Sequence, residues 1–138
     1  MSETAIDVAV AVIRDAAGRI LVNKRQIDKE HPGMWEFPGG KFDPHETPEQ
    51  ALYRECEEEL GIRVKAAQEL ICLSHEYPKK TVCLHVFVVS EYLNIPQALE
   101  QQEMAWKTLN ELMVFEGLLQ ADRPILEKLI ELESENYT

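Results

Sequence analysis

The feature that most constrains the fold of this chain is a helix whose start and stop are both encoded in residues 47–61. The stretch "TPEQ" supplies Thr47 as an N-cap, a proline at the first helical position and a glutamine three residues after the cap, which together form a capping box. Gly61 supplies the stop, because glycine readily adopts the left-handed conformation that ends many helices. A helix is therefore predicted between these two residues.

The last turns of this helix carry an unfavourable run of acids, "RECEEELG" at residues 54–61. The C-terminal end of a helix bears about half a negative charge, and glutamates three or four residues apart repel each other by roughly 0.2–0.5 kcal/mol per pair. A rotation of about 100° per residue places Glu55, Glu58 and Glu59 on one face. The same rotation turns Glu57 almost to the opposite side.

Two interpretations of the shared face follow. Three carboxylates within one helical turn offer hard oxygen ligands for Mg²⁺ or Mn²⁺, and such a cation would offset the repulsion between them. The alternative is a solvated acidic face. The neighbouring face is apolar and predicts the side that packs on the core; it consists of Leu52, Tyr53, Cys56 and Leu60.

Alternating Val- and Ile-rich segments predict strands on both sides of this helix. We expect strands at 5–13, 19–25, 34–37, 62–77 and 81–92 and near Trp106, with the first two paired as a hairpin through the turn at 15–18. Two further helices are predicted, a short one opened by a second capping box at 108–111 and an amphipathic one at 121–133. This order indicates a mixed sheet covered by helices.

The segment "FPGGKFDPHETPEQALYRECEEELGI" resembles the Nudix box. Eight fixed positions over 23 residues are matched, by Gly40, Glu46, Arg54, Glu55, Glu58, Glu59, Gly61 and Ile62. Cys56 stands where an aliphatic residue is usual, a mild departure because a buried thiol behaves as a small apolar group. Glu57, which the helical rotation turns away, falls on a variable position.

Nearly the whole chain is similar to the MutT branch of that family. The resemblance implies an α/β protein with the Nudix fold, an α/β/α sandwich with a mixed β-sheet, in a single domain over residues 1–138. It also implies hydrolysis of a nucleoside triphosphate to a monophosphate and pyrophosphate with Mg²⁺, for which Mn²⁺ could substitute. The metal ligands would be the carbonyl at Gly39 or Gly40 together with Glu55, Glu58, Glu59 and Glu100.

Other residues receive roles from the same resemblance. Glu100 would be an extra ligand or the general base, and its alternative is a plain loop glutamate. Arg54 and Glu46 would form an orienting ion pair. Arg25 and Lys80 would contact phosphate or sugar, and Glu36, Phe37 and Tyr77 would line the base pocket. The alternatives are surface cations for the first two and core packing for Phe37.

Asp122 is the informative departure from the resemblance. Relatives specific for oxidised guanine carry asparagine in the matching segment, and an ionised aspartate can only accept hydrogen bonds. "ADRP" is closer to members that act on cytidine nucleotides or on a broader set. On overall resemblance we nevertheless expect 8-oxo-dGTP as the substrate, with CTP or modified dCTP as the alternative. Asp122 could instead be the N-cap of the last helix.

Composition limits the partners. The chain holds 14 basic and 25 acidic residues, a formal net charge of −11, which argues against a nucleic-acid polymer or an anionic membrane as partner. Its three cysteines show no CxxC spacing and favour a reducing compartment. No signal peptide is evident, so we expect a cytoplasmic location. We also expect a monomer. A non-catalytic nucleotide-sensing or partner-binding module is the alternative of another class.

Overall fold

The computed structural model describes residues 4–27 and 29–136. Its backbone divides into two compact units, each built from two stretches of chain. The first unit comprises residues 1–13 and 38–101, and the second comprises residues 14–37 and 102–138. The prediction of one domain over residues 1–138 stays a prediction.

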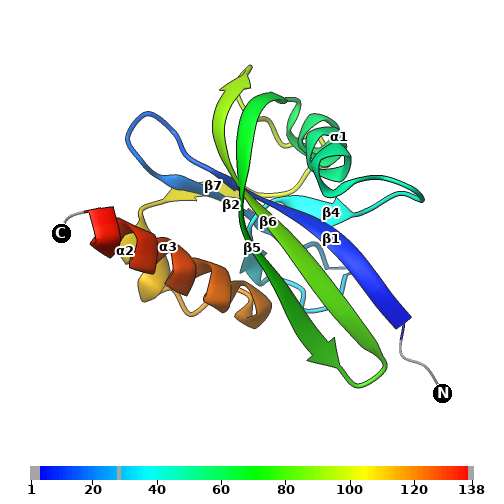
Figure 1. The fold of residues 1–138 in the computed structure, drawn as a ribbon. Coiled ribbons are helices and arrows are strands. Elements are labelled where there is room, and N and C mark those ends of the chain that lie inside the picture. Colours follow the sequence, from blue (N-terminus) through cyan, green and yellow to red (C-terminus); the bar gives the residue numbers. More distant parts are fainter. Residues whose placement is uncertain (1–3, 28, 137–138) are drawn as a thin grey trace. The chain divides into compact units, whose positions relative to one another are not determined.

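The first unit contains a four-stranded sheet in the order β4-β1-β6-β5 (Figure 1). Its central strands β1 and β6 run parallel, whereas β4 and β5 are antiparallel to their neighbours. The sheet is therefore mixed, as predicted. The strands are β1 (Thr4–Ile13), β4 (Gly39–Lys41), β5 (Arg63–Tyr77) and β6 (Lys80–Leu93).

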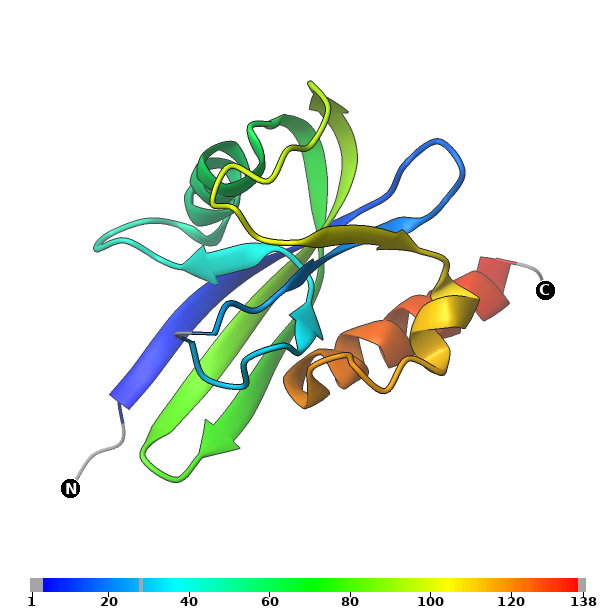
Figure 2. The same ribbon diagram turned by 180° about the vertical axis from the view of Figure 1, so that it is seen from behind.

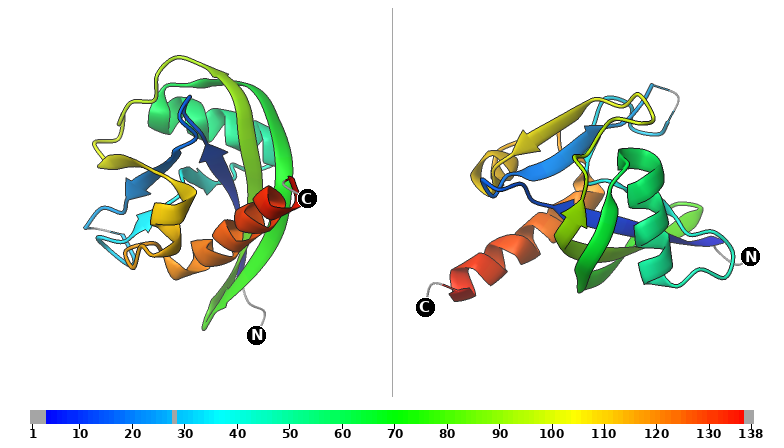
Figure 3. Two further views of the ribbon diagram at one scale, coloured as in Figure 1. Left: turned by 90° about the vertical axis from the view of Figure 1, so that its left-hand side faces the viewer. Right: turned by 90° about the horizontal axis from the view of Figure 1, so that it is seen from above.

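Helix α1 (Pro48–Leu60) lies on one face of this sheet, against β1, β4 and β5 (Figure 3). Both predicted ends are present, because Thr47 accepts from the amide of Gln50 and Gly61 adopts φ 69°. The predicted apolar face is wrong at one position. Tyr53 is 43% exposed, whereas Glu59 is buried beside Leu60.

Strand β4 was not predicted, because "PGG" normally breaks a strand. Gly39 pairs with Val10 of β1 at φ 154°, and a Cβ at Gly39 would overlap the Ala9 carbonyl. Gly40 lies next to α1, since a Cβ there would sit 2.5 Å from Glu55 Oε2. The two glycines thus allow β1, β4 and the carboxylate of Glu55 to approach closely.

The second unit contains a three-stranded antiparallel sheet in the order β3-β2-β7 (Figure 2). The strands are β2 (Ile20–Lys24), β3 (Trp35–Glu36) and β7 (Met104–Lys107). The predicted hairpin is wrong for the strands themselves: in the described chain β1 pairs with β4 and β6, whereas β2 pairs with β3 and β7. The hairpin is reduced to one antiparallel bridge beside the turn, between Arg14 and Ile20. The turn at 15–18 is present, with Gly18 donating to the Asp15 carbonyl.

The helices of the second unit follow β7. They are α2 (Leu109–Met113), the 3₁₀ turn η1 (Gln120–Asp122) and α3 (Arg123–Asn136). The predicted capping box is present at Thr108 and Glu111. The guanidinium of Arg123 donates to the carbonyls of Leu112, Met113 and Phe115, which ties the start of α3 to the end of α2.

The close approach at Gly39 gives a stability prediction. Gly39→Ala should lower the free energy of unfolding by at least about 3 kcal/mol, because the new Cβ meets rigid backbone. Gly18→Ala is the matched control, since Gly18 also has positive φ (81°) but has open space around it. It should cost only about 1 kcal/mol. Urea unfolding measures both, and equal losses would contradict the close packing.

Candidate active site

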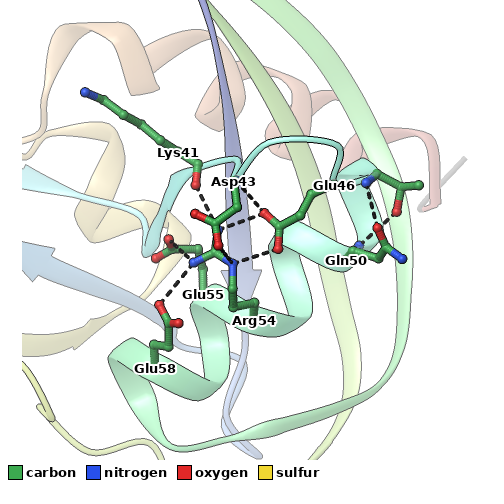
Figure 4. Close-up of polar contacts among 8 residues, drawn as sticks. Lys41, Asp43, Glu46, Gln50, Arg54, Glu55 and Glu58 are labelled. Atoms are coloured by element: carbon green, nitrogen blue, oxygen red, sulfur yellow. Dashed lines mark hydrogen bonds and ion pairs between the residues drawn. The ribbon is translucent and has the colours of Figure 1, made fainter.

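The guanidinium of Arg54 is the centre of a polar network on α1 (Figure 4). Nε and Nη2 donate to the two carboxylate oxygens of Glu46 at 2.7 and 2.9 Å. Nη2 also donates to the Lys41 carbonyl at 2.9 Å. Nη1 donates to Glu55 at 2.9 Å and to Glu58 at 3.0 Å. All five N–H groups of Arg54 are therefore used, and three carboxylates are fixed around one cation.

The loop before α1 presents Glu46 to this arginine. The Asp43 amide donates to Glu46 Oε1 at 2.7 Å, and the Glu46 amide donates to the Asp43 carbonyl at 3.2 Å. The hydrogen bond from Arg54 lowers the pKa of Glu46. Asp43 Oδ2 also lies 3.1 Å from Arg54 Nε, so Asp43 belongs to the network. The sequence analysis missed Asp43, although its position three residues before Glu46 is compatible with a turn.

The predicted ion pair of Arg54 and Glu46 is thus present, and its orienting role stays a prediction. Glu57 is exposed, as the helical rotation predicted. Burial raises the pKa of Glu55. The hydrogen bond and the charge of Arg54 lower it, and the negative charges of Glu58 and Glu100 raise it. The charge of Glu100 therefore acts on Glu55.

The carboxylates of α1 fit a hard divalent cation by their chemistry. They are oxygen donors, and Gly40, which lacks a Cβ, leaves room for the Glu55 carboxylate beside β4. Within residues 4–27 and 29–136, no three His, Cys, Asp or Glu side chains form a group arranged to hold a metal. Glu55 and Glu58 turn toward Arg54 instead. The predicted ligand set, including Gly39, Glu59 and Glu100, stays a prediction.

Cys56 lies on the buried side of α1, where it is 3% exposed. Burial raises the pKa of this thiol to about 12, and the charges of Glu59 and Glu55 add to the effect. The thiol therefore stays protonated at neutral pH. This agrees with its interpretation as a small apolar group at that position of the helix.

A second polar group lies in the second unit, around Asp122. Asp122 is 5% exposed, and its Oδ2 accepts from the Phe37 amide at 2.9 Å. The pKa of Asp122 is raised to about 7, mainly by burial; the Phe37 amide lowers it, the charge of Glu36 raises it and that of Arg25 lowers it. Arg25 Nη1 donates to Glu36 at 2.7 Å. The Asp122 carboxylate thus accepts a hydrogen bond from the backbone just after β3. This is not the hydrogen bond that an N-cap of the last helix would make.

The structure brings together four of the six predicted substrate-binding residues, Arg25, Glu36, Phe37 and Asp122. Phe37 is 3% exposed, so its ring is part of the packed interior. The other two predicted residues lie in the first unit, where Lys80 Nζ is 5.3 Å from the ring centroid of Tyr77. Asn23, buried on β2 opposite Glu36, is a polar neighbour that the sequence analysis missed.

Comparison with known proteins identifies the family. The NUDIX domain signature matches residues 4–129. The 8-oxo-dGTP diphosphatase of Haemophilus influenzae is 40% identical over 106 residues, which are 77% of this chain and 78% of that protein. The CTP pyrophosphohydrolase of Escherichia coli K12 is 34% identical over 125 residues, covering 91% of this chain and 92% of that protein.

A solved structure of a related protein has the same fold. The MutT NUDIX hydrolase from Burkholderia pseudomallei superposes with a TM-score of 0.81 at 32% identity, covering 91% of this chain and 98% of that chain. The predicted fold class, an α/β Nudix fold with a mixed sheet, is confirmed. The chain belongs to the NUDIX family. It is a hydrolase that acts on pyrophosphate bonds, in a family that depends in general on divalent metals.

None of the described helices combines the length and apolar character needed to cross a lipid bilayer.

Burial of Asp122 gives a pH prediction. Its pKa rises from 3.8 to about 7 on folding, so between these values the folded state holds a proton that the unfolded state has lost. The free energy of unfolding should therefore fall as pH rises from about 4 through 7, by roughly 2–4 kcal/mol. Asp122→Asn should remove this fall in urea titrations at pH 5 and 8. Asp15→Asn, at a half-buried carboxylate whose pKa is lowered, should keep it.

Proposed function

We propose that the protein is a Mg²⁺-dependent nucleoside triphosphate pyrophosphohydrolase that converts NTP and water to NMP and pyrophosphate. The observation that carries the proposal is the network on α1, in which Glu46, Glu55 and Glu58 surround Arg54 at the positions of the Nudix box. Such a fixed set of oxygens on a rigid helix suits phosphate chemistry, where the protein contributes mainly positioning and electrostatics.

Each residue has a proposed part in the reaction. Glu55, Glu58 and Glu59 hold the cation with Glu100 and the carbonyl of Gly39 or Gly40. Bound Mg²⁺ supplies neutralisation of phosphate oxygens and a lower pKa for bound water. Arg54 keeps Glu46, Glu55 and Glu58 oriented through four of its N–H groups, and the fifth donates to the Lys41 carbonyl. Glu100 accepts a proton or adds a ligand, and no covalent nucleophile is required.

The proposed substrate is 8-oxo-dGTP, which would make the enzyme an antimutator of the nucleotide pool. The name of the Haemophilus relative supports this, and so does the raised pKa of Asp122. A protonated carboxyl can donate as well as accept, as an asparagine amide does. The second candidate is CTP or modified dCTP, supported by the Escherichia coli relative that matches 91% of the chain.

The remaining expectations are part of the same proposal. Residues 1–138 act as one catalytic domain in a cytoplasmic monomer, without nucleic-acid polymer or membrane partners. The net charge of −11 supports the absence of nucleic-acid and anionic membrane partners, and the free thiols of Cys56, Cys72 and Cys83 support a reducing compartment. A binding module without catalysis is less well supported, since binding alone has no need of the complete network around Arg54.

The reaction is tested with a panel of normal and oxidised nucleotides, assayed for monophosphate and pyrophosphate with and without Mg²⁺. Glu58→Gln should lower kcat by roughly 10²–10⁴-fold, because a cation ligand is lost. Glu57→Gln is the matched control, since Glu57 is its exposed neighbour on the opposite side of α1. It should retain the wild-type rate. Equal rates for both variants would refute the assignment of the site.

The base preference is tested separately by the ratio of kcat/KM for 8-oxo-dGTP to that for dGTP. If the neutral form of Asp122 reads the base, the wild-type ratio should fall between pH 6 and pH 8.5, as the carboxyl with a pKa of about 7 ionises. Asp122→Asn should keep a ratio that does not change with pH, because an amide does not titrate. A wild-type enzyme that prefers CTP over 8-oxo-dGTP would overturn the substrate choice.

A further inference from the structure

The C-terminal carbonyls of α1 are bonded by a segment far along the chain. The last carbonyls of a helix have no intrahelical partner and must bond elsewhere. The Gln97 amide donates to the Leu60 carbonyl at 2.9 Å. The Leu99 amide is shared between the Glu59 carbonyl at 3.2 Å and the Gln97 carbonyl at 3.0 Å. We call residues 94–101 the strap, because they lie between β6 and β7 and attach to the end of α1.

The strap has a defined conformation. Asn94 and Gln101, at its two ends, both adopt positive φ, 76° and 62°. The Gln101 amide donates to the Ala98 carbonyl at 3.1 Å, which closes a turn around Leu99 and Glu100. Leu99 lies over Gly61, since a Cβ at Gly61 would be 3.2 Å from Leu99 Cδ1. The strap is therefore attached by backbone hydrogen bonds, by the Asn94 side chain, whose Nδ2 donates to the Gly61 carbonyl at 3.4 Å, and by one apolar side chain.

Glu100 directly follows the attached residue Leu99, and its charge interacts with Glu55 of α1. We infer that Gln97 and Leu99 are positioning residues, whose amides on the end of α1 hold the Glu100 carboxylate beside the helix glutamates for a divalent cation. This inference rests on the cation site of the proposed function. It adds that the helix and loop ligands are joined before the cation arrives, which reduces the ordering cost of binding.

The test uses Mn²⁺ as a paramagnetic probe of nucleotide-free protein, with its dissociation constant measured by electron paramagnetic resonance. Leu99→Pro removes the amide that donates to Glu59 and should raise the Mn²⁺ dissociation constant about fivefold, the factor for one net hydrogen bond of about 1 kcal/mol. Ala98→Pro is the matched control, because the Ala98 amide donates no hydrogen bond in the part of the chain that the structure describes. It should bind Mn²⁺ as the wild type does.

A double-mutant cycle separates positioning from general loosening. Glu100→Gln should weaken Mn²⁺ binding at least as much as Leu99→Pro, and the double variant should be no weaker than Glu100→Gln alone. The inference would be overturned if the factors by which the two single substitutions raise the Mn²⁺ dissociation constant multiply in the double variant. It would also be overturned if Leu99→Pro or Glu100→Gln left that dissociation constant unchanged. If Leu99→Pro does not fold, Gln97→Pro, which removes the amide that donates to the Leu60 carbonyl, takes its place in the cycle.

The same measurements separate the two proposals. A wild-type protein that binds Mn²⁺ but hydrolyses no nucleotide refutes the proposed function, and the cycle still decides the role of the strap. A wild-type protein that hydrolyses nucleotides, with binding that Leu99→Pro leaves unchanged, refutes only the strap. Absence of Mn²⁺ binding by the wild type overturns both.

Discussion

The interaction on which the first unit depends is the bonding of one guanidinium by several carboxylates. Without Arg54, the carboxylates of α1 and its preceding loop would repel each other, and those of Glu55 and Glu58 would also lie near the negative end of the helix. With it, Glu46, Glu55 and Glu58 are held in fixed orientations. Arginine suits this place better than lysine, because its planar fork bonds both oxygens of Glu46 and still reaches two further carboxylates. The arginine thus makes an otherwise repulsive set of ligands compatible with a stable fold.

The local features of the fold could be predicted from sequence, and the distant pairings could not. The caps at Thr47, Gly61 and Thr108 follow from rules that involve neighbouring residues, and all three are present. The hairpin prediction was wrong because strand partners are chosen across the whole chain. Strand β4 was missed for a similar reason: its glycines serve a close approach to Ala9 that a local rule reads only as a break.

The candidate site shows the same division. The box glutamates were found from fixed spacing, and helical rotation correctly turned Glu57 outward. The rotation did not predict that Glu59 would be buried while Tyr53 is exposed, because hydrophobicity alone favours the reverse. Asp122 was recognised as unusual, but its partner, the amide of Phe37, is 85 positions away and could be identified only in the fold.

The buried thiol of Cys56 bears on the conditions under which such an enzyme works. Peroxides attack thiolates, and a thiol with a pKa of about 12 and 3% exposure offers almost no thiolate to them. The one cysteine on the helix of the candidate site is therefore chemically inert. Oxidants that react with thiolates should therefore leave Cys56 unmodified, so the helix that carries the proposed ligands has no oxidation-sensitive thiol at its packed face.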